Sequence, residues 1–133
     1  LWRDPGSTVH DSSDSASVMI VQAGTSAGEP VPVDVHNQAA WDTHVAATRA
    51  ALGEGDDPPD LVVWPETVLR VPVLRKPTWR RRIEALSAEL DAPLLVGVLD
   101  RDRTGVAEHN AALLVDPFMR RPAEPGSGPP PRR

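Results

Sequence analysis

The sequence contains no cysteine, and this absence limits the chemistry that its 133 residues can carry alone. A chain without cysteine forms no disulfide bond, offers no thiolate to a metal ion and supplies no thiol nucleophile. Aromatic residues are also scarce apart from four tryptophans, and Lys76 is the single lysine among 14 basic residues. The missing cysteine leaves the redox compartment of the protein open.

Long apolar runs are absent as well. No stretch approaches the roughly 18–20 apolar residues that cross a bilayer, and the polar, acidic first residues do not resemble a signal peptide. The net charge of −5 argues against a nucleic-acid partner, because phosphate binding needs a clustered basic surface. We therefore expect a soluble chain with no transmembrane segment, and nothing in the sequence indicates a cofactor.

Composition divides the chain into three parts. Residues 1–16 are rich in Ser, Asp, Gly and Pro without periodicity, which predicts a flexible linker. Residues 118–133 end in a proline-rich run, which predicts a disordered tail. Residues 17–117 hold the regular apolar patterns, and we expect the folded domain there.

Short apolar runs bounded by turn-forming residues are typical of buried strands, and they predict strands at residues 18–21, 61–64, 94–99 and 111–115. Helical periodicity predicts a first helix over residues 35–52 and a second helix after Thr78. Each helix places four residues at i, i+4, i+7 and i+11 on one face: Trp41, Val45, Thr48 and Leu52, then Trp79, Ile83, Leu86 and Leu90. Three residues are predicted to cap the helices: Asp34, Gly53 and Thr78.

The predicted element order is β-α-β-α-β-β. The link between the last two strands lacks helical periodicity and contains Gly105, so it predicts a hairpin. Continuous apolar strands that alternate with amphipathic helices predict a sheet covered by helices, which is the α/β class.

Residues 60–67, DLVVWPET, are the segment most suggestive of chemistry. They place Glu66 at the carboxyl end of a buried strand, where open α/β sheets hold their ligands. Trp64 is expected to form an apolar wall, and Pro65 to end the strand so that the carboxylate turns outward. A carboxylate that is partly removed from water has a raised pKa, which suits a general base. A glutamate at a strand end that simply faces solvent is the competing interpretation.

This segment resembles the one that carries the general-base glutamate of the nitrilase (carbon–nitrogen hydrolase) superfamily, and its Trp-Pro-Glu form is similar to the apolipoprotein N-acyltransferases. Other segments agree in order and spacing: residues 18–22 (VMIVQ), the helix before residue 60, residues 91–97 (DAPLLVG) and residues 109–117 (HNAALLVDP). The resemblance covers residues 17–117. It implies part of a nitrilase-type α-β-β-α sandwich, with about four strands and two helices, an uncovered sheet edge and face, and marginal stability in isolation.

The resemblance also implies a mechanism with a Glu base, a Lys that stabilises the oxyanion and a Cys nucleophile. In the acyltransferases, phospholipid acylates the Cys, and the acyl group passes to the N-terminal cysteine amine of an apolipoprotein. Only Glu66 carries over as a catalytic residue. Lys76 lies before the second helix, away from the family's lysine position, and Arg120 and Arg121 stand in no recognisable motif. The chain alone is therefore expected to be inactive, and its parent protein to be membrane-embedded with this domain outside the cytoplasm.

Two alternatives stay open at this point. The first is a fragment of a soluble amidase or nitrilase that acts on small carbon–nitrogen compounds, although such enzymes more commonly carry Phe-Pro-Glu. The second is a non-catalytic nitrilase-like interaction module.

The remaining polar residues favour structural interpretations. The four histidines have no metal-ligand spacing, and Asp56, Asp57 and Asp60 indicate a turn rather than a calcium loop. Residues 80–82, three consecutive arginines, are typical of a solvated helix face. Arg70, Arg75 and Lys76 add positive charge after Glu66, and contact with anionic lipid is a weaker alternative for these cations.

Overall fold

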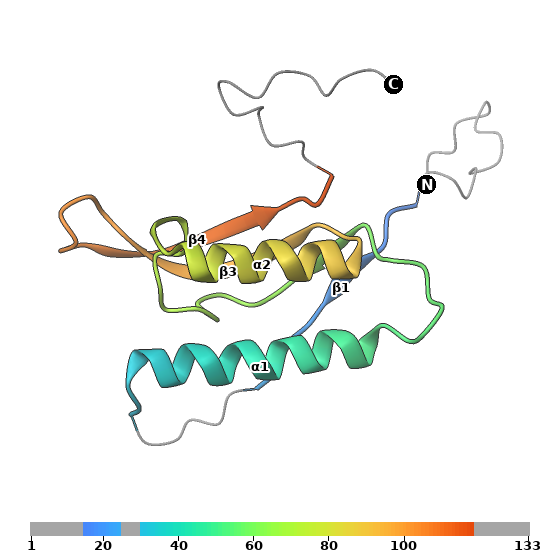
Figure 1. The fold of residues 1–133 in the computed structure, drawn as a ribbon, viewed down its shortest axis with the longest axis horizontal. Helices are drawn as coiled ribbons and strands as arrows, with labels where there is room; N and C mark the ends of the chain where they lie inside the picture. The colour runs from blue at the N-terminus through green and yellow to red at the C-terminus, as the bar shows by residue number, and fades with distance from the viewer. Residues whose placement is uncertain (1–14, 25–29, 119–133) are drawn as a thin grey trace, which may run out of the picture.

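The computed structural model describes residues 15–24 and 30–118. Its elements follow the predicted order (Figure 1): β1 (Val18–Ile20), α1 (Val33–Ala51), β2 (Leu61–Val63), the short 3-10 helix η2 (Val73–Arg75), α2 (Pro77–Leu90), β3 (Leu94–Arg101) and β4 (Glu108–Val115). Most of the predicted linker and nearly all of the predicted tail lie outside the described residues.

The four strands form one mixed sheet in the order β1-β2-β3-β4. The pairs β1–β2 and β2–β3 are parallel, whereas β3 and β4 form the antiparallel hairpin predicted from the sequence. Each parallel pair is joined through a helix, as parallel connections require. The α/β prediction is confirmed, with four strands and two helices.

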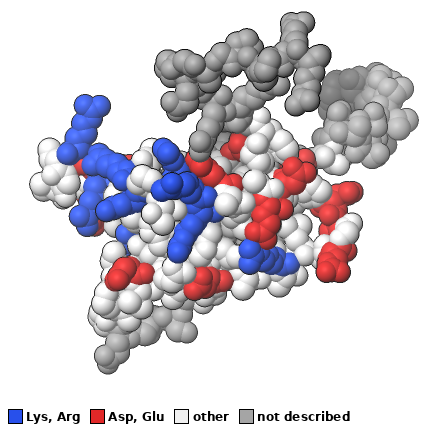
Figure 2. Space-filling view, in the orientation of Figure 1, with Lys and Arg blue, Asp and Glu red and all other residues white. Residues whose placement is uncertain are grey.

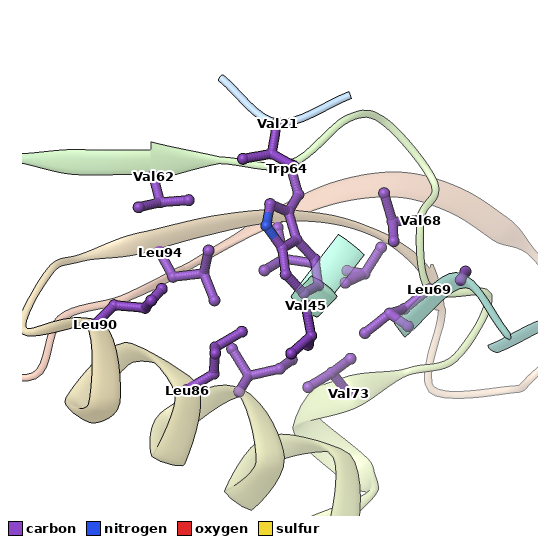
Figure 3. Close-up of a cluster of buried hydrophobic side chains, with 14 of the residues drawn as sticks. Val21, Val45, Val62, Trp64, Val68, Leu69, Val73, Leu86, Leu90 and Leu94 are labelled. Atoms are coloured by element: carbon purple, nitrogen blue, oxygen red, sulfur yellow. The ribbon is translucent and has the colours of Figure 1, made fainter. Parts of the chain in front are cut away.

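Both helices cover the same face of the sheet. Every second strand residue joins one buried cluster with the apolar faces of α1 and α2, and Figure 3 shows Val62, Trp64 and Leu94 meeting Leu86 and Leu90 of α2. The helices run side by side in the same direction (Figure 1), and pairs near both ends join them. Gln38 accepts a hydrogen bond from Arg82, and Arg49 forms a salt bridge with Glu89 at 2.8 Å.

On the opposite face of the sheet, which we call the open face, the described residues place no helix. Its alternate residues include Val18, Ile20 and Leu114, whose exposed fractions are 54%, 74% and 58%. The strand β1, which its apolar run predicted as a buried strand, therefore has one exposed side. Short apolar runs signal a strand, but they do not reveal whether a second layer covers it.

The helix boundaries were predicted to within a few residues, but the caps were not. Asp34 lies in the first turn of α1, because the helix begins at Val33 after Pro32, with no side-chain cap. The same helix ends through extended Leu52 rather than through a left-handed Gly53. Thr78 lies inside α2, whose first residue is Pro77, since proline suits the first helical position.

The β3–β4 hairpin extends further than its apolar core. The ladder runs to the pair Arg101↔Glu108, where sequence patterning predicted only residues 94–99 and 111–115. Backbone pairing and an Arg101–Glu108 salt bridge at 2.5 Å hold these polar ends together. Asp102 closes the turn by accepting hydrogen bonds from the Thr104 hydroxyl and the Val106 amide. No helix among the described residues is long and apolar enough to cross a membrane.

Candidate functional site

Glu66 lies on an excursion of the chain that interrupts the pairing of β2 with β3. Val63 pairs with Leu95, and pairing resumes only at an isolated bridge between Leu69 and Val98. Between these two pairing points the chain after β2 has five residues, 64–68, whereas β3 has only two, 96 and 97. Pro65 cannot donate a ladder hydrogen bond, and Thr67 adopts a positive φ of 56°, so the chain leaves the sheet and returns. Glu66 stands in the middle of this excursion.

Gly97 on β3 provides the space for the excursion. A Cβ at this position would lie 2.1 Å from the Pro65 carbonyl oxygen and 2.6 Å from Glu66 Cα. Gly97 shares its strand face with Leu95, opposite the buried Leu94 and Val96, so the excursion crosses the open face. The absence of a side chain at Gly97 therefore allows the backbone of Glu66 to lie close against the sheet.

Asn110 on β4 orients the Glu66 carboxylate. Its Nδ2 donates a short hydrogen bond to Glu66 Oε1, and its Oδ1 accepts one from the Thr67 hydroxyl at 3.0 Å. These two contacts assign the amide orientation, because only the nitrogen can donate to a carboxylate. One side chain thus ties the excursion after β2 to a strand two positions away in the sheet.

Trp64 anchors the excursion from the helix side. Its side chain is 2% exposed, and its indole Nε1 donates to the Thr48 hydroxyl of α1 at 3.0 Å. The ring centroids of Trp41 and His44 lie 5.5 Å and 5.2 Å from that of Trp64. Buried aromatic contacts with a satisfied indole N–H fix the end of β2, and Glu66 with it.

Two hollows share Glu66 as part of their walls. One, of about 370 Å³, lies on the open face and is also lined by Trp64, Leu95, Gly97, Asn110, Ala111 and Ala112. The other, of about 210 Å³, lies at the edge where β1 and β2 end and is lined by Gln22 and Thr67 among others. Trp64 therefore contributes to the wall that the sequence predicted.

His36 and His44 of α1 also line the smaller hollow. The Nδ1 of His44 contacts the Ala40 carbonyl oxygen at 2.8 Å, which places the proton of the neutral ring on Nδ1. The Nε2 atoms of both rings are buried and have no hydrogen-bond partner among the residues that the structure describes. Burial and, to a smaller extent, the Arg70 cation lower the pKa of His36.

Glu66 itself is exposed. The sequence predicted a carboxylate partly removed from water, and this expectation is not met in the described part of the chain. The reason is the open face, on which the described residues place neither a helix nor a further strand over the carboxylate.

The other site candidates do not gather around Glu66. Lys76 is exposed before the first turn of α2 and lines a different hollow, between the two helices. Arg120 and Arg121 lie outside the described residues. No group of three histidine, aspartate or glutamate side chains is placed to hold a metal ion within residues 15–24 and 30–118.

The acidic residues near β2 have structural roles. Asp60 accepts a hydrogen bond from the Ser17 backbone amide at 2.6 Å, which ties the start of β1 to the start of β2. Asp56 accepts one from the Gly53 amide at 2.9 Å and closes the turn after α1. The prediction of a turn here is confirmed.

Sequence reasoning did not single out Asn110 as a site residue. It lies 44 positions from Glu66, and only the hairpin and the excursion together bring the two side chains into contact. The sequence signal for Asn110 was a polar side chain directly before the apolar run of residues 111–115.

Comparison of the chain with protein-family models and with curated proteins gave no match.

Proposed function

We propose that the chain is the N-terminal part of a carbon–nitrogen hydrolase-type domain of an apolipoprotein N-acyltransferase, with Glu66 as its general base. The observation that supports this most directly is the carboxylate held over a strand end by Asn110. A base must be oriented before it can accept a proton efficiently, and this contact supplies orientation.

The hydrogen-bond pattern suits proton transfer. Among the described residues, Asn110 is the one hydrogen-bond partner of the carboxylate, and it engages Oε1. The second oxygen, Oε2, is left to take a proton from a nucleophile in the adjoining hollow. In the proposed reaction Glu66 takes up the proton of the nucleophile as it attacks an acyl carbonyl of phospholipid. The ester C–O bond then breaks, and the same proton passes to the oxygen of the departing lysophospholipid.

The nucleophile and the oxyanion-stabilising cation must come from outside this chain. The sequence has no cysteine, and its one lysine, Lys76, shares neither hollow with Glu66. In the proposed whole protein a further segment supplies both residues. The acyl acceptor is then the N-terminal amine of an apolipoprotein, and the domain stands outside the cytoplasm on a membrane-embedded parent.

The open face supports the finer fold proposal, a half of an α-β-β-α sandwich. Val18, Ile20 and Leu114 expose apolar surface on the same face of the sheet as the hollow that Glu66 lines. A second sheet packed on this face would bury these side chains and exclude water from the carboxylate. Because a carboxylate removed from water is a stronger base, such packing would complete both the core and the site.

The test is acyl labelling of the protein expressed from its own gene. An epitope tag inserted between Thr104 and Gly105, in the exposed hairpin turn, marks the product without touching Glu66. We expect a tagged product larger than this chain that takes up a fatty acyl group from phospholipid through a hydroxylamine-sensitive thioester. Glu66→Gln is expected to reduce labelling by roughly 100-fold or more.

A matched control is Glu108→Gln, which removes an exposed carboxylate of the hairpin and should leave labelling unchanged. A tagged product without label, or full labelling of the Glu66→Gln protein, would refute the proposal. Release of ammonia from small amides, without phospholipid-dependent labelling, would favour the soluble amidase alternative.

A further inference from the structure

Positive charge is concentrated on one side of the molecule. Residues 70–84 carry six basic side chains and one acidic side chain, whereas the whole chain has a net charge of −5. Figure 2 shows Lys and Arg gathered over the region of α2 and the β3–β4 hairpin, with Asp and Glu gathered toward the other end. Such segregation creates a local field that the net charge conceals.

We define the basic face as the exposed cations of η2, the start of α2 and the hairpin end: Arg75, Lys76, Arg80, Arg81, Arg101 and Arg103. A hydrogen bond of 3.0 Å from Arg75 Nη1 to the Asp102 carbonyl oxygen joins η2 to the hairpin turn. These two turns are therefore neighbours, although they are 27 residues apart in sequence.

Most of these cations are not neutralised by the protein. Within the described part of the chain, salt bridges involve Arg80 with Glu84 at 3.6 Å and Arg101 with Glu108, and both pairs are partly exposed. Arg75, Lys76, Arg81 and Arg103 have no carboxylate partner there. Arg82 is excluded from the face because it bonds Gln38 and lies 4.8 Å over the Trp79 ring.

Helix stability does not explain why arginines lie at the start of α2. The first turn of α2 contains no acidic residue, and arginines begin within it. The N-terminal end of a helix dipole is positive, so cations there weaken the helix. An external anion that contacts the basic face would remove this conflict.

Two large apolar side chains stand out from the same two turns. Leu74 of η2 is 63% exposed and Val106 of the hairpin turn is 83% exposed. Cations beside protruding apolar side chains match the interface of an anionic bilayer, where headgroups neutralise charge and the apolar groups enter the acyl boundary. Nucleic acid fits less well, because no exposed aromatic ring of the described residues accompanies the cations for base stacking.

We propose that the basic face docks the protein on an anionic lipid bilayer, with Leu74 and Val106 entering the headgroup region. This inference goes beyond the proposed function, because docking requires neither Glu66 nor acyl transfer. It also predicts that the side formed by η2, the start of α2 and the hairpin turn faces the membrane.

The test is co-sedimentation of the full chain with vesicles. We expect binding to vesicles that contain equal parts of phosphatidylglycerol and phosphatidylcholine, and much weaker binding to phosphatidylcholine alone. Raising sodium chloride from about 0.1 M to about 0.5 M should release the protein, since salt screens exposed charges. Glu66→Gln should bind like the unmodified chain, which separates this result from any failure of the acyltransferase proposal.

Paired variants locate the surface. Lys76→Gln with Arg81→Gln should weaken binding roughly 25-fold, because each cation near an anionic surface contributes about fivefold. Thr43→Glu with Ala50→Glu lowers net charge equally but on exposed positions of α1, and should weaken binding by no more than about threefold. Leu74→Ser with Val106→Ser should weaken binding several-fold while its salt dependence remains. Circular dichroism checks that each variant is folded.

Three results would overturn the proposal. They are equal binding to both vesicle types, equal losses in the Lys76→Gln/Arg81→Gln and Thr43→Glu/Ala50→Glu variants, and displacement from anionic vesicles by a short DNA duplex at matched phosphate concentration. The last result would mean that the basic face binds polyanions in general.

Discussion

At the scale of single residues, Gly97 is a position next to Glu66 where the backbone leaves no room for a side chain. We expect Gly97→Ala to lower the free energy of unfolding by about 1–3 kcal/mol or more, because the new methyl group must displace the backbone at Pro65 and Glu66. Urea denaturation measures the change. Gly24→Ala is the matched control, because a Cβ there meets nothing within 4 Å. Equal stability of the two variants would contradict the close approach.

His36 gives a residue-scale prediction for pH. Burial first, and the Arg70 cation second, lower its pKa below the ordinary 6.5, so the unfolded chain takes up a proton at a pH where the folded chain does not. Stability should therefore fall as pH decreases below about 6.5 and level off once the folded state is also protonated. Thermal unfolding between about pH 7.5 and about pH 5 measures this effect, because an ordinary histidine titrates within this range.

His36→Asn is the comparison for that experiment. It keeps a polar side chain that does not titrate, so the midpoint should depend less steeply on pH in the variant. An identical slope would show that groups other than His36 account for the dependence.

At the scale of elements, one hydrogen bond joins α1 to the end of β2. The Thr48 hydroxyl, which is fully buried, accepts from Trp64 Nε1. Thr48→Val leaves the indole N–H unpaired, and we expect a loss of about 1–3 kcal/mol in the free energy of unfolding. Urea denaturation followed by tryptophan fluorescence measures it.

Thr43→Val is the matched control on the same helix. Both threonine hydroxyls donate to a carbonyl four residues earlier, but Thr43 is exposed and Thr48 also contacts Trp64. A loss of the same size in both variants would mean that the helical contact, and not the Trp64 bond, carries the effect.

The sequence predicted elements better than it predicted contacts between them. Apolar runs and periodicity gave the order of strands and helices, because each signal lies within a few neighbouring residues. The polar ends of the β3–β4 ladder and the contact from Asn110 to Glu66 depend on pairing between distant segments. Glu66 was placed at its strand end from Pro65 and the preceding apolar run, whereas its exposure depends on what lies over the open face.

At the scale of the whole molecule, the open face predicts association of the isolated chain. Exposed Ile20 and Leu114 lie on a sheet surface that neither α1 nor α2 covers. We expect concentration-dependent self-association in sedimentation velocity, and a shift toward monomer in the variant Ile20→Lys/Leu114→Lys. The control Val33→Lys/Val35→Lys changes two exposed apolar residues on α1 and should leave association unchanged. A monomeric unmodified chain at high concentration would contradict the prediction.

The order of strands in the sheet has a consequence for synthesis on the ribosome. Because β1, β2, β3 and β4 are neighbours in space as they are in sequence, each strand can join the growing sheet as it emerges, and no earlier pair must open. Every intermediate of this vectorial assembly has a free edge on the newest strand. The domain can therefore be extended by later segments without rearranging the part that holds Glu66.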